Sequence, residues 1–289
     1  MKKTVLLFLL ISGFTSQAQI TDIDGNSYDT VRIGTQMWMA ENLNVSRFRN
    51  GDEIPMVVTD EDWALASKNK QPAWCYVFND SSSSVLLGKL YNWYAVNDSR
   101  GLAPEGWHVA SDTDWTQLTD HLGGNYYERT DASTEAQKLK DTSSVNINSI
   151  RGLNYRYVKD SVYANDYWLP DFSWLPADSN LDNNITGLTL RAGITRPDNG
   201  SFPVPNQLDD WILDVDAYVG AYFWTSTIGQ NKNKKVVLRW SDQVGGIHKK
   251  TKTYSMKKMP LTRYVANEDL VYRMTAKEGQ GLFVRCIKD

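Results

Sequence analysis

The order of the strand and helix patterns constrains the fold of this chain most strongly. Runs of alternating, β-branched or aromatic residues predict strands in five segments: YDTVRIG (28–34), LTLRAGITR (188–196), AYFWTST (221–227), VVLRW (236–240) and LFVRCI (282–287). Two segments predict helices, and both lie in the first half of the chain, whereas most of the strands lie in the second half. Helices and strands that are segregated rather than alternating are typical of α+β proteins and argue against a nucleotide-binding parallel sheet.

Both predicted helices have capping signals. The first begins after Ser111, a candidate N-cap with Asp114 three residues later, and ends at Gly123. Its apolar stripe consists of Trp115, Leu118 and Leu122. The second covers residues 133–141 and has a serine cap, an acid in its first turn and two lysines near its end: Ser133, Glu135, Lys138 and Lys140.

The N-terminus has the pattern of a secretory signal. Two lysines are followed by an apolar run, Val5 to Phe14, and by the small-residue sequence SQAQ, which predicts cleavage after Ala18. The apolar run is too short for a membrane span of about 20 residues. No cysteine stands at the cleavage site, so a lipid anchor is not expected. The mature chain, 19–289, is therefore expected to be a secreted single domain, periplasmic or extracellular.

The chain has two cysteines, Cys75 and Cys286. In an oxidising compartment two lone cysteines form a disulfide more often than they remain free, so a bridge between them is expected. Two buried, unreacted thiols are the alternative, and a catalytic cysteine is a third interpretation.

Six blocks of sequence occur together in this order: IDGNSYDTVRIGTQMWMAENLN (23–44), GKLYNWYAVND (88–98), GLAPEGWHVASDTDWTQLTDHLGG (101–124), TGLTLRAGITRPDNGSF (186–202), AYFWTSTI (221–228) and FVRCIKD (283–289). Together they resemble the Fibrobacter succinogenes major paralogous domain family. The resemblance implies a C-type lectin-like fold, distantly similar to the formylglycine-generating enzymes, in which two helices pack on a twisted, mostly antiparallel sheet with long inserted loops. It also implies that the first and last strands meet at the base of the domain. Members are secreted or surface proteins of Bacteroidota and Fibrobacteres, mostly without an assigned activity.

The chain departs from the family pattern at several places. Ala103 stands where members often have a cysteine, and Ala110 where they often have a proline. Without the first of these cysteines, Cys75 and Cys286 are the only possible pair, which strengthens the expectation of a bridge. Two stretches are longer than is usual in the family, one near 142–184 and the other near 245–278.

No catalytic constellation is visible in the sequence. Formylglycine-generating chemistry needs a close pair of cysteines near the C-terminal end, whereas Cys286 stands alone. The three histidines, His108, His121 and His248, have no metal-ligand spacing, and neither a GxSxG motif nor a P-loop is present. The chain is therefore not expected to be an enzyme or to need a cofactor. An uncharacterised enzyme that reuses a lectin-like scaffold, with carbohydrate as substrate, is the alternative.

The first long insertion combines aromatic and acidic residues. Aromatic faces stack on sugar rings, while carboxylate and amide oxygens accept hydrogen bonds from hydroxyls or bind Ca²⁺. The candidate ligand-binding residues are Tyr167, Trp168, Asp171, Trp174, Asp178, Asp182 and Asn184. Alternatively, the tryptophans anchor the insertion to the core and the acids and amides form its turns. Calcium stays possible, although no known calcium-loop motif supports it.

The second long insertion is basic. Between Lys232 and Arg263 only one acid, Asp242, stands among many lysines. The candidate basic patch consists of Lys249, Lys250, Lys252, Lys257 and Lys258. Such a patch could bind an anionic polymer, such as an acidic glycan, a lipopolysaccharide phosphate or extracellular DNA, whereas secretion argues against genomic nucleic acid. The alternative is a long exposed hairpin that lysines keep soluble.

These patterns predict a secreted binding or adhesion module whose ligand is a glycan or another cell-surface polymer. A shallow aromatic platform would favour binding, and a deep pocket with convergent carboxylates would favour catalysis.

Overall fold

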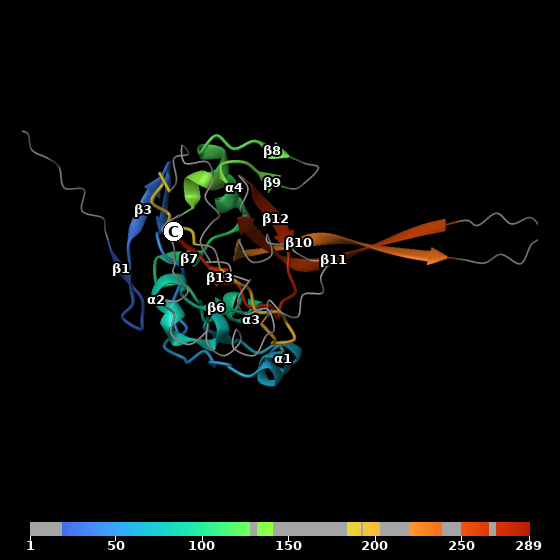
Figure 1. Ribbon diagram of the computed structural model, residues 1–289, viewed down its shortest axis with the longest axis horizontal. Helices are drawn as coiled ribbons and strands as arrows, with labels where there is room; N and C mark the ends of the chain where they lie inside the picture. Colours follow the sequence, from blue (N-terminus) through green and yellow to red (C-terminus); the bar gives the residue numbers. More distant parts are fainter. Residues whose placement is uncertain are drawn as a thin grey trace, which may run out of the picture.

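The computed structural model describes residues 19–127, 132–140, 184–191, 193–202, 220–238, 250–265 and 270–289. Within these ranges the protein is an α+β fold with a few short helices and several mainly antiparallel sheets (Figure 1). None of the described helices is both long and apolar enough to cross a bilayer.

The helices lie in the first half of the chain and the longest strands in the second, as predicted. The helices are α1 (Asp60–Lys68), α2 (Ser84–Leu87), α3 (Trp93–Val96) and α4 (Asp112–His121), with 3₁₀ turns η1 (Val77–Asn79), η2 (Ser81–Ser83) and η3 (Ala136–Leu139). The strands are β1 (Ile20–Thr21), β2 (Ser27–Tyr28), β3 (Thr30–Ile33), β4 (Gln36–Met39), β5 (Trp74–Cys75), β6 (Leu90–Tyr91), β7 (Trp107–Val109), β8 (Tyr126–Tyr127), β9 (Ala132–Ser133), β10 (Ala221–Leu238), β11 (Lys250–Val265), β12 (Val271–Thr275), β13 (Phe283–Val284) and β14 (Cys286–Lys288).

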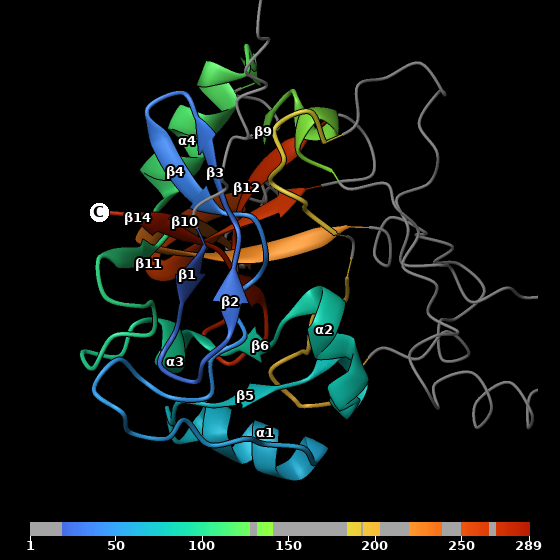
Figure 2. The same ribbon diagram turned by 90° about the vertical axis from the view of Figure 1, so that its left-hand side faces the viewer.

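A four-stranded sheet joins two N-terminal strands to the last strand of the chain. Its order is β3-β4-β14-β7, and Ile287 of β14 pairs with Trp38 on one side and His108 on the other. Figure 2 shows β14 near β4. N-terminal and C-terminal strands therefore meet as expected, through β4 and β14, whereas the first strand, β1, pairs with β2 in a separate sheet.

The long antiparallel hairpin β10–β11 is the centre of a six-stranded sheet of order β13-β10-β11-β12-β9-β8. Its ladder runs from the pair Ala221 and Val265 to the pair Leu238 and Lys250. Among the described residues, the contacts of β13 with β10 and of β12 with β11 are confined to the root of the hairpin. The rest of the hairpin is a two-stranded ribbon that projects from the body, on the side away from the C-terminus (Figure 1).

The segment LFVRCI forms two strands rather than the single strand predicted. β13 runs parallel to β10, whereas β14 pairs with β4 and β7. Arg285 lies at the break and is only 1% exposed. Its guanidinium donates to Asn42 Oδ1 at 2.7 Å, to the carbonyls of Met39 and Ala40, and to two carbonyls of the 188–189 segment. At the point where the strand changes sheets, this side chain thus bonds to two distant segments, 39–42 and 188–189.

Helix α4 confirms the first helix prediction. Ser111 Oγ accepts a hydrogen bond from the backbone N–H of Asp114, and the Asp114 carboxylate accepts one from the backbone N–H of Ser111 at 2.7 Å. This reciprocal capping box satisfies two donors at the start of the helix. At the other end, Gly123 has φ +90°, a left-handed conformation that glycine adopts without strain.

The second helix prediction is wrong. Ser133 lies in β9, where its backbone pairs with Val271 and Tyr126, and only the short turn η3 follows. Strand pairing on both sides of Ser133 outweighs its tendency to cap a helix. Helix α1, which was not predicted, has the local signal of such a cap, because Thr59 Oγ1 accepts from the backbone N–H of Asp62 at 3.1 Å.

The strand predicted over 188–196 is also not formed. Leu190, Gly193 and Arg196 instead make isolated bridges to three different segments. The backbone therefore crosses over the core without joining one ladder. Two predictions are confirmed by contrast: β3 lies within 28–34 and β10 includes 221–227. Of the predicted strand 236–240, residues 236–238 lie in β10, and the other two lie outside the described residues.

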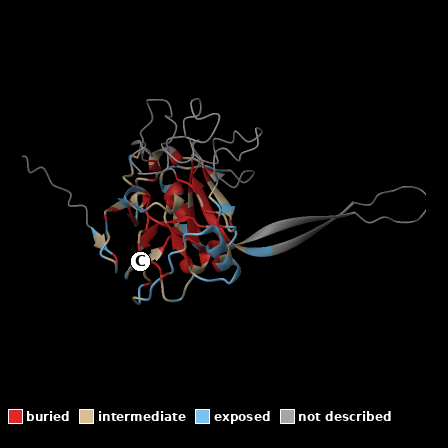
Figure 3. Ribbon diagram, turned by 60° about the horizontal axis from the view of Figure 1, so that its bottom comes forward, coloured by how far each residue is buried: buried red, intermediate tan, exposed pale blue. Residues whose placement is uncertain are grey.

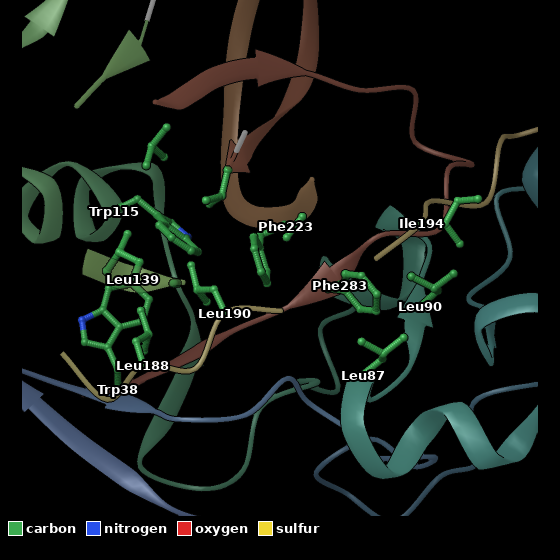
Figure 4. Packing of buried hydrophobic residues seen from close by; sticks show 14 of the residues in the cluster. Trp38, Leu87, Leu90, Trp115, Leu139, Leu188, Leu190, Ile194, Phe223 and Phe283 are labelled. Atoms are coloured by element: carbon green, nitrogen blue, oxygen red, sulfur yellow. The ribbon is translucent and has the colours of Figure 1, made fainter. Parts of the chain in front are cut away.

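Aromatic side chains link the elements of the core. In one hydrophobic cluster Trp115 of α4 packs against Trp38 of β4 and Phe223 of β10, with both pairs of ring centroids 5.3 Å apart (Figure 4). A second cluster contains Trp93 and Trp224, whose ring centroids are 5.4 Å apart. Figure 3 shows that the buried residues lie within the body from which the hairpin projects.

The expected disulfide is not formed. Cys75 and Cys286 are both buried free thiols. Cys75 on β5 belongs to the first hydrophobic cluster, whereas Cys286 on β14 belongs to the second. Burial raises the pKa of Cys75 to about 11 and raises that of Cys286 as well, so both side chains are neutral thiols at pH 7. The base of the fold is held by strand pairing instead.

We expect thiol titration to distinguish a bridge from free cysteines. Without reductant, the native protein should react only slowly with a thiol reagent, because both thiols are buried and protonated. After unfolding in denaturant, both cysteines of each chain should react. A sample reduced before unfolding provides the control. If only the reduced sample reacts in denaturant, the two cysteines are bridged and the assignment of free thiols is wrong.

Lys89 is a cation that the fold buries, with 5% of the residue exposed. Its Nζ donates to the Asn44 carbonyl and to Ser46 Oγ, both at 2.7 Å, and lies 4.2 Å from the centre of the Trp74 ring. Burial lowers the pKa of Lys89 to about 8 from an ordinary value of 10.5, although Asp24 and Asp22 act in the opposite direction.

This pKa predicts how stability depends on pH. Between about pH 8 and 10.5 the folded Lys89 loses its proton while the unfolded side chain keeps it, so the unfolded state binds more protons and the Lys89 contribution rises with pH. Below about pH 8 both forms are protonated and the contribution is constant. Urea unfolding of the wild type and of Lys89→Met at pH 7 and 9.5 measures this effect. The wild type should gain stability relative to the variant at the higher pH, and an unchanged or smaller difference would contradict the lowered pKa.

Candidate functional site

Most of the ligand-binding residues predicted in the first insertion lie outside the described residues: Tyr167, Trp168, Asp171, Trp174, Asp178 and Asp182. Asn184 is described and forms a turn. Its side-chain oxygen accepts from the backbone N–H of Thr189 at 3.0 Å, and its carbonyl accepts from that of Gly187 at 3.0 Å. The aromatic site itself therefore stays a prediction.

The predicted basic patch lies on the hairpin. Lys249 is outside the described residues, whereas Lys250, Lys252, Lys257 and Lys258 lie on β11. Lys257 and Lys258 are exposed near the root of the hairpin, opposite Asn231 and Gln230. Neither lysine side chain makes a hydrogen bond or an ion pair with any other residue described in the structure.

These two lysines line a cleft of about 180 Å³ at the base of the hairpin, called here the hairpin-base cleft. The cleft brings together four parts of the chain: α1, α3, the 197–200 turn and the segment after β12, all facing β11. Its lining residues are Ser67, Tyr94, Asp198, Lys257, Lys258, Met259, Pro260, Ala276, Lys277, Glu278 and Gly279.

Backbone and side-chain hydrogen bonds fix one wall of this cleft. The Glu278 carbonyl accepts from the Trp93 backbone N–H, and the Gly279 carbonyl accepts from Trp63 Nε1, both at 2.9 Å. Gly279 also lies so close to Ser67 that a Cβ there would be 1.7 Å from its hydroxyl oxygen. A side chain at position 279 would therefore force α1 away from the wall.

The two carboxylates of the cleft already have partners. Asp198 forms an ion pair with Lys277, whose Nζ lies 3.0 Å from Oδ2. Glu278 Oε2 accepts a hydrogen bond of 3.2 Å from the Tyr94 hydroxyl. Burial and the Glu278 carboxylate raise the pKa of Tyr94 to about 12, so this hydroxyl remains a donor at neutral pH. Three lysines and two carboxylates line the cleft, so its net formal charge is +1. Lys257 and Lys258 are the two of these lysines that form no ion pair.

A second groove, of about 380 Å³, lies against α1. Its lining includes Pro55, Val57, Leu65, Pro72 and Arg100. Arg100 is already paired with Asp98 and Asp52. This groove offers mainly apolar surface and lacks the free positive charge of the hairpin-base cleft.

Three tyrosines, one from each of β10, β11 and β12, form a ladder across the six-stranded sheet. Tyr222 and Tyr264 are opposite each other in the register, as are Tyr264 and Tyr272. Their rings stack with centroid distances of 4.2 and 5.7 Å. Because the faces of these rings stack on one another, the ladder stiffens the sheet. It does not form the flat aromatic platform expected of a sugar site.

Two of the histidines are part of the scaffold. His108 on β7 contacts the Asp289 carboxylate through Nδ1 at 2.8 Å and that of Asp114 through Nε2 at 3.2 Å. His121 at the end of α4 packs on Gly34. His248 lies outside the described residues. Within the described ranges, no group of three or more histidine, cysteine, aspartate or glutamate side chains is placed to hold a metal ion.

Sequence reasoning found two residues of the hairpin-base cleft, Lys257 and Lys258, and missed the others. Asp198 lies in the sequence PDNG and Lys277 and Glu278 in KEGQG, which are both rich in turn-forming residues. This signal places the residues on loops, but it does not indicate that the two loops meet. Tyr94 lies in the short helix α3 and has no local signal of a binding role.

Comparison with known proteins identifies one family. The model of the Fibrobacter succinogenes major domain matches residues 31–288, which is most of the chain. No curated protein and no solved structure was found to match the chain significantly.

Proposed function

We propose a binding role for this chain, which belongs to the Fibrobacter succinogenes major domain family. In this role the protein is a secreted, non-enzymatic binding or adhesion module for an anionic cell-surface polymer, such as an acidic glycan. The family match gives no activity, so the proposal depends on the chemistry of the described surface. The signal pattern of the first 18 residues supports the secreted location in this proposal.

The observation that carries the proposal is the unbalanced positive charge at the root of the projecting hairpin. The whole chain has a formal net charge of −3, yet β11 contributes Lys257 and Lys258, for which the described structure provides no acidic partner. A ribbon that projects from the body can contact a long polymer without steric hindrance from the rest of the fold. Clustered positive charge on an otherwise acidic protein favours a polyanion by local electrostatic attraction.

The finer fold assignment is also part of this proposal. Pairing of the N-terminal strand β4 with the C-terminal strand β14 and the location of the helices in the first half of the chain support a C-type lectin-like arrangement. In such an arrangement the loops and hairpin away from the base are free to bind a ligand.

Binding of the full-length mature chain to immobilised polymers tests the proposal. We expect retention on a sulfated or uronic-acid polysaccharide and not on a neutral one such as dextran. The affinity should fall steeply as the salt concentration rises from about 50 to 200 mM, because the polymer releases bound counterions when the lysines bind it. Equal retention on neutral and acidic polymers, no retention on either, or shortening of the polymer during the assay would contradict a polyanion-binding module.

A further inference from the structure

We propose that the hairpin-base cleft is a discrete site for one acidic sugar unit, a monosaccharide that carries a carboxylate beside several hydroxyls. This inference rests on the proposed function, since it names the part of an anionic glycan that the protein would recognise. It assigns separate roles to the lysines, the paired carboxylates and the apolar residues of the cleft.

The size of the cleft limits the ligand. Sites for drug-sized molecules usually occupy about 300–1,000 Å³. The hairpin-base cleft has about 180 Å³ and is therefore suited to a single ring or a charged end group. A nucleotide or a branched oligosaccharide would extend beyond it.

The lining offers the three kinds of contact that an acidic sugar needs. Lys257 and Lys258 both line the cleft without a side-chain partner, and the one whose side chain faces it is free to pair with the ligand carboxylate. Carboxylate oxygens accept hydrogen bonds from hydroxyls, and both Asp198 and Glu278 have acceptor capacity left beyond their present partners. The C–H groups of a sugar ring can pack on the apolar residues of the lining, which are Met259, Pro260 and Ala276.

The paired state of the two carboxylates favours an acidic ligand over a cationic one. Lys277 neutralises Asp198, and the Tyr94 hydroxyl donates to Glu278. The charge of Asp198 is therefore offset by Lys277, and the orientation of the Glu278 carboxylate is fixed by Tyr94. A cationic ligand would have to compete with Lys277 and would meet the two free lysines of β11.

The cleft is also formed in advance of binding. Trp63 and Trp93 hold the carbonyls of Gly279 and Glu278, and a bond of 2.7 Å from the Arg196 side chain holds the Gly200 carbonyl beside Asp198. A rigid wall lowers the conformational entropy lost on binding. A weak but specific site for a small ligand is the expected result.

The test uses D-glucuronate as the probe and D-glucose as its neutral counterpart, each titrated into the full-length mature chain and followed by NMR or calorimetry. Glucuronate should bind in a saturable manner, and glucose should bind at least about tenfold more weakly because it lacks the carboxylate. Sodium acetate provides the control for a carboxylate alone. Acetate that binds as tightly as glucuronate would contradict a sugar site.

Single variants assign the roles within the cleft. Neighbouring side chains on a strand point to opposite faces, so one of Lys257→Gln and Lys258→Gln should weaken glucuronate binding by about tenfold and the other should have a smaller effect. Glu278→Gln removes a negative charge beside the ligand and should strengthen glucuronate binding. Lys288→Gln changes an exposed lysine on β14, which pairs with β4 and β7 and does not line the cleft, and should have no effect.

The outcomes separate this inference from the proposed function. If acidic polymers bind in a salt-dependent manner and glucuronate does not saturate, the discrete sugar site is wrong and the polyanion-binding role stands. If glucuronate binds equally to the wild type and to both lysine variants, the cleft is not its site. If neither polymer nor monosaccharide binds, the proposed function fails together with this inference.

Discussion

Replacing Arg285 by lysine is expected to destabilise the protein by about 3–5 kcal/mol, as breaking a buried charged network does. The guanidinium bonds to two distant segments: to Asn42 Oδ1 and two carbonyls within 39–42, and to the carbonyls of 188–189. A lysine keeps the charge but has three donors on one atom, so it cannot reach acceptors in several directions at once. Burial lowers the pKa of Arg285 to about 9, so the side chain is still charged at pH 7.

Chemical unfolding of Arg285→Lys and the wild type measures this loss. Arg49→Lys is the matched control, because Arg49 also donates to three carbonyls, those of Ala103, Pro104 and Trp107, but is exposed. Water can replace its bonds, so the control should lose only about 1 kcal/mol. If Arg285→Lys does not yield folded protein while Arg49→Lys does, the prediction is also met. Equal losses in the two variants would show that the burial of Arg285 does not matter.

Replacing Arg196 by methionine is expected to have an effect of similar size on stability and a second effect on the hairpin-base cleft. Arg196 is fully buried between Trp63 and Phe202, with its guanidinium carbon 4.6 and 5.0 Å from the two ring centres. It donates to the carbonyls of Val57, Val58, Thr59 and Gly200. Methionine fills part of the volume but removes a fully buried charge together with its bonds to four carbonyls, of which that to Gly200 is buried, so we expect a loss of about 3–5 kcal/mol.

The second effect follows from the position of Arg196 next to the turn that carries Asp198. Without the bond to the Gly200 carbonyl, the 197–200 turn should exchange its amide hydrogens faster, while those of α4 should be little changed. Arg49→Met serves as the matched control. Unfolding and hydrogen exchange measure the two effects. A stable Arg196→Met variant with unchanged exchange in this turn would contradict the role assigned to the arginine.

The sequence predicted those parts of the fold that depend on local signals. The capping box of Ser111 and Asp114 identifies α4 because all its interactions lie within a few residues. Pairing of the terminal strands was expected from the family resemblance and is confirmed by Ile287 and Trp38. The sequence could not show that a strand breaks at Arg285, because the partners of this arginine are about 100 and 245 residues away.

The errors have the same physical origin. Ser133 was assigned to a helix cap because serine often has that role, yet its backbone pairs with Val271, which is far away in the chain. The two cysteines were paired because of their number, although the fold buries them in different hydrophobic clusters. The cleft was found only in part, since its lysines form a charge pattern whereas Asp198 and Glu278 come together only in the folded protein.

The affinity of the double variant Lys257→Gln/Lys258→Gln for an immobilised uronic-acid polysaccharide tests the central claim most directly, compared with the wild type and with Lys288→Gln. At about 1 kcal/mol for each lysine near an anionic surface, the double variant should bind roughly 30-fold more weakly, with a smaller dependence on salt. Circular dichroism should show both variants folded, because these lysines are exposed and their side chains make no bond to another described residue. Wild-type affinity in the double variant, or an equal loss in Lys288→Gln, would contradict a binding surface at the root of the hairpin.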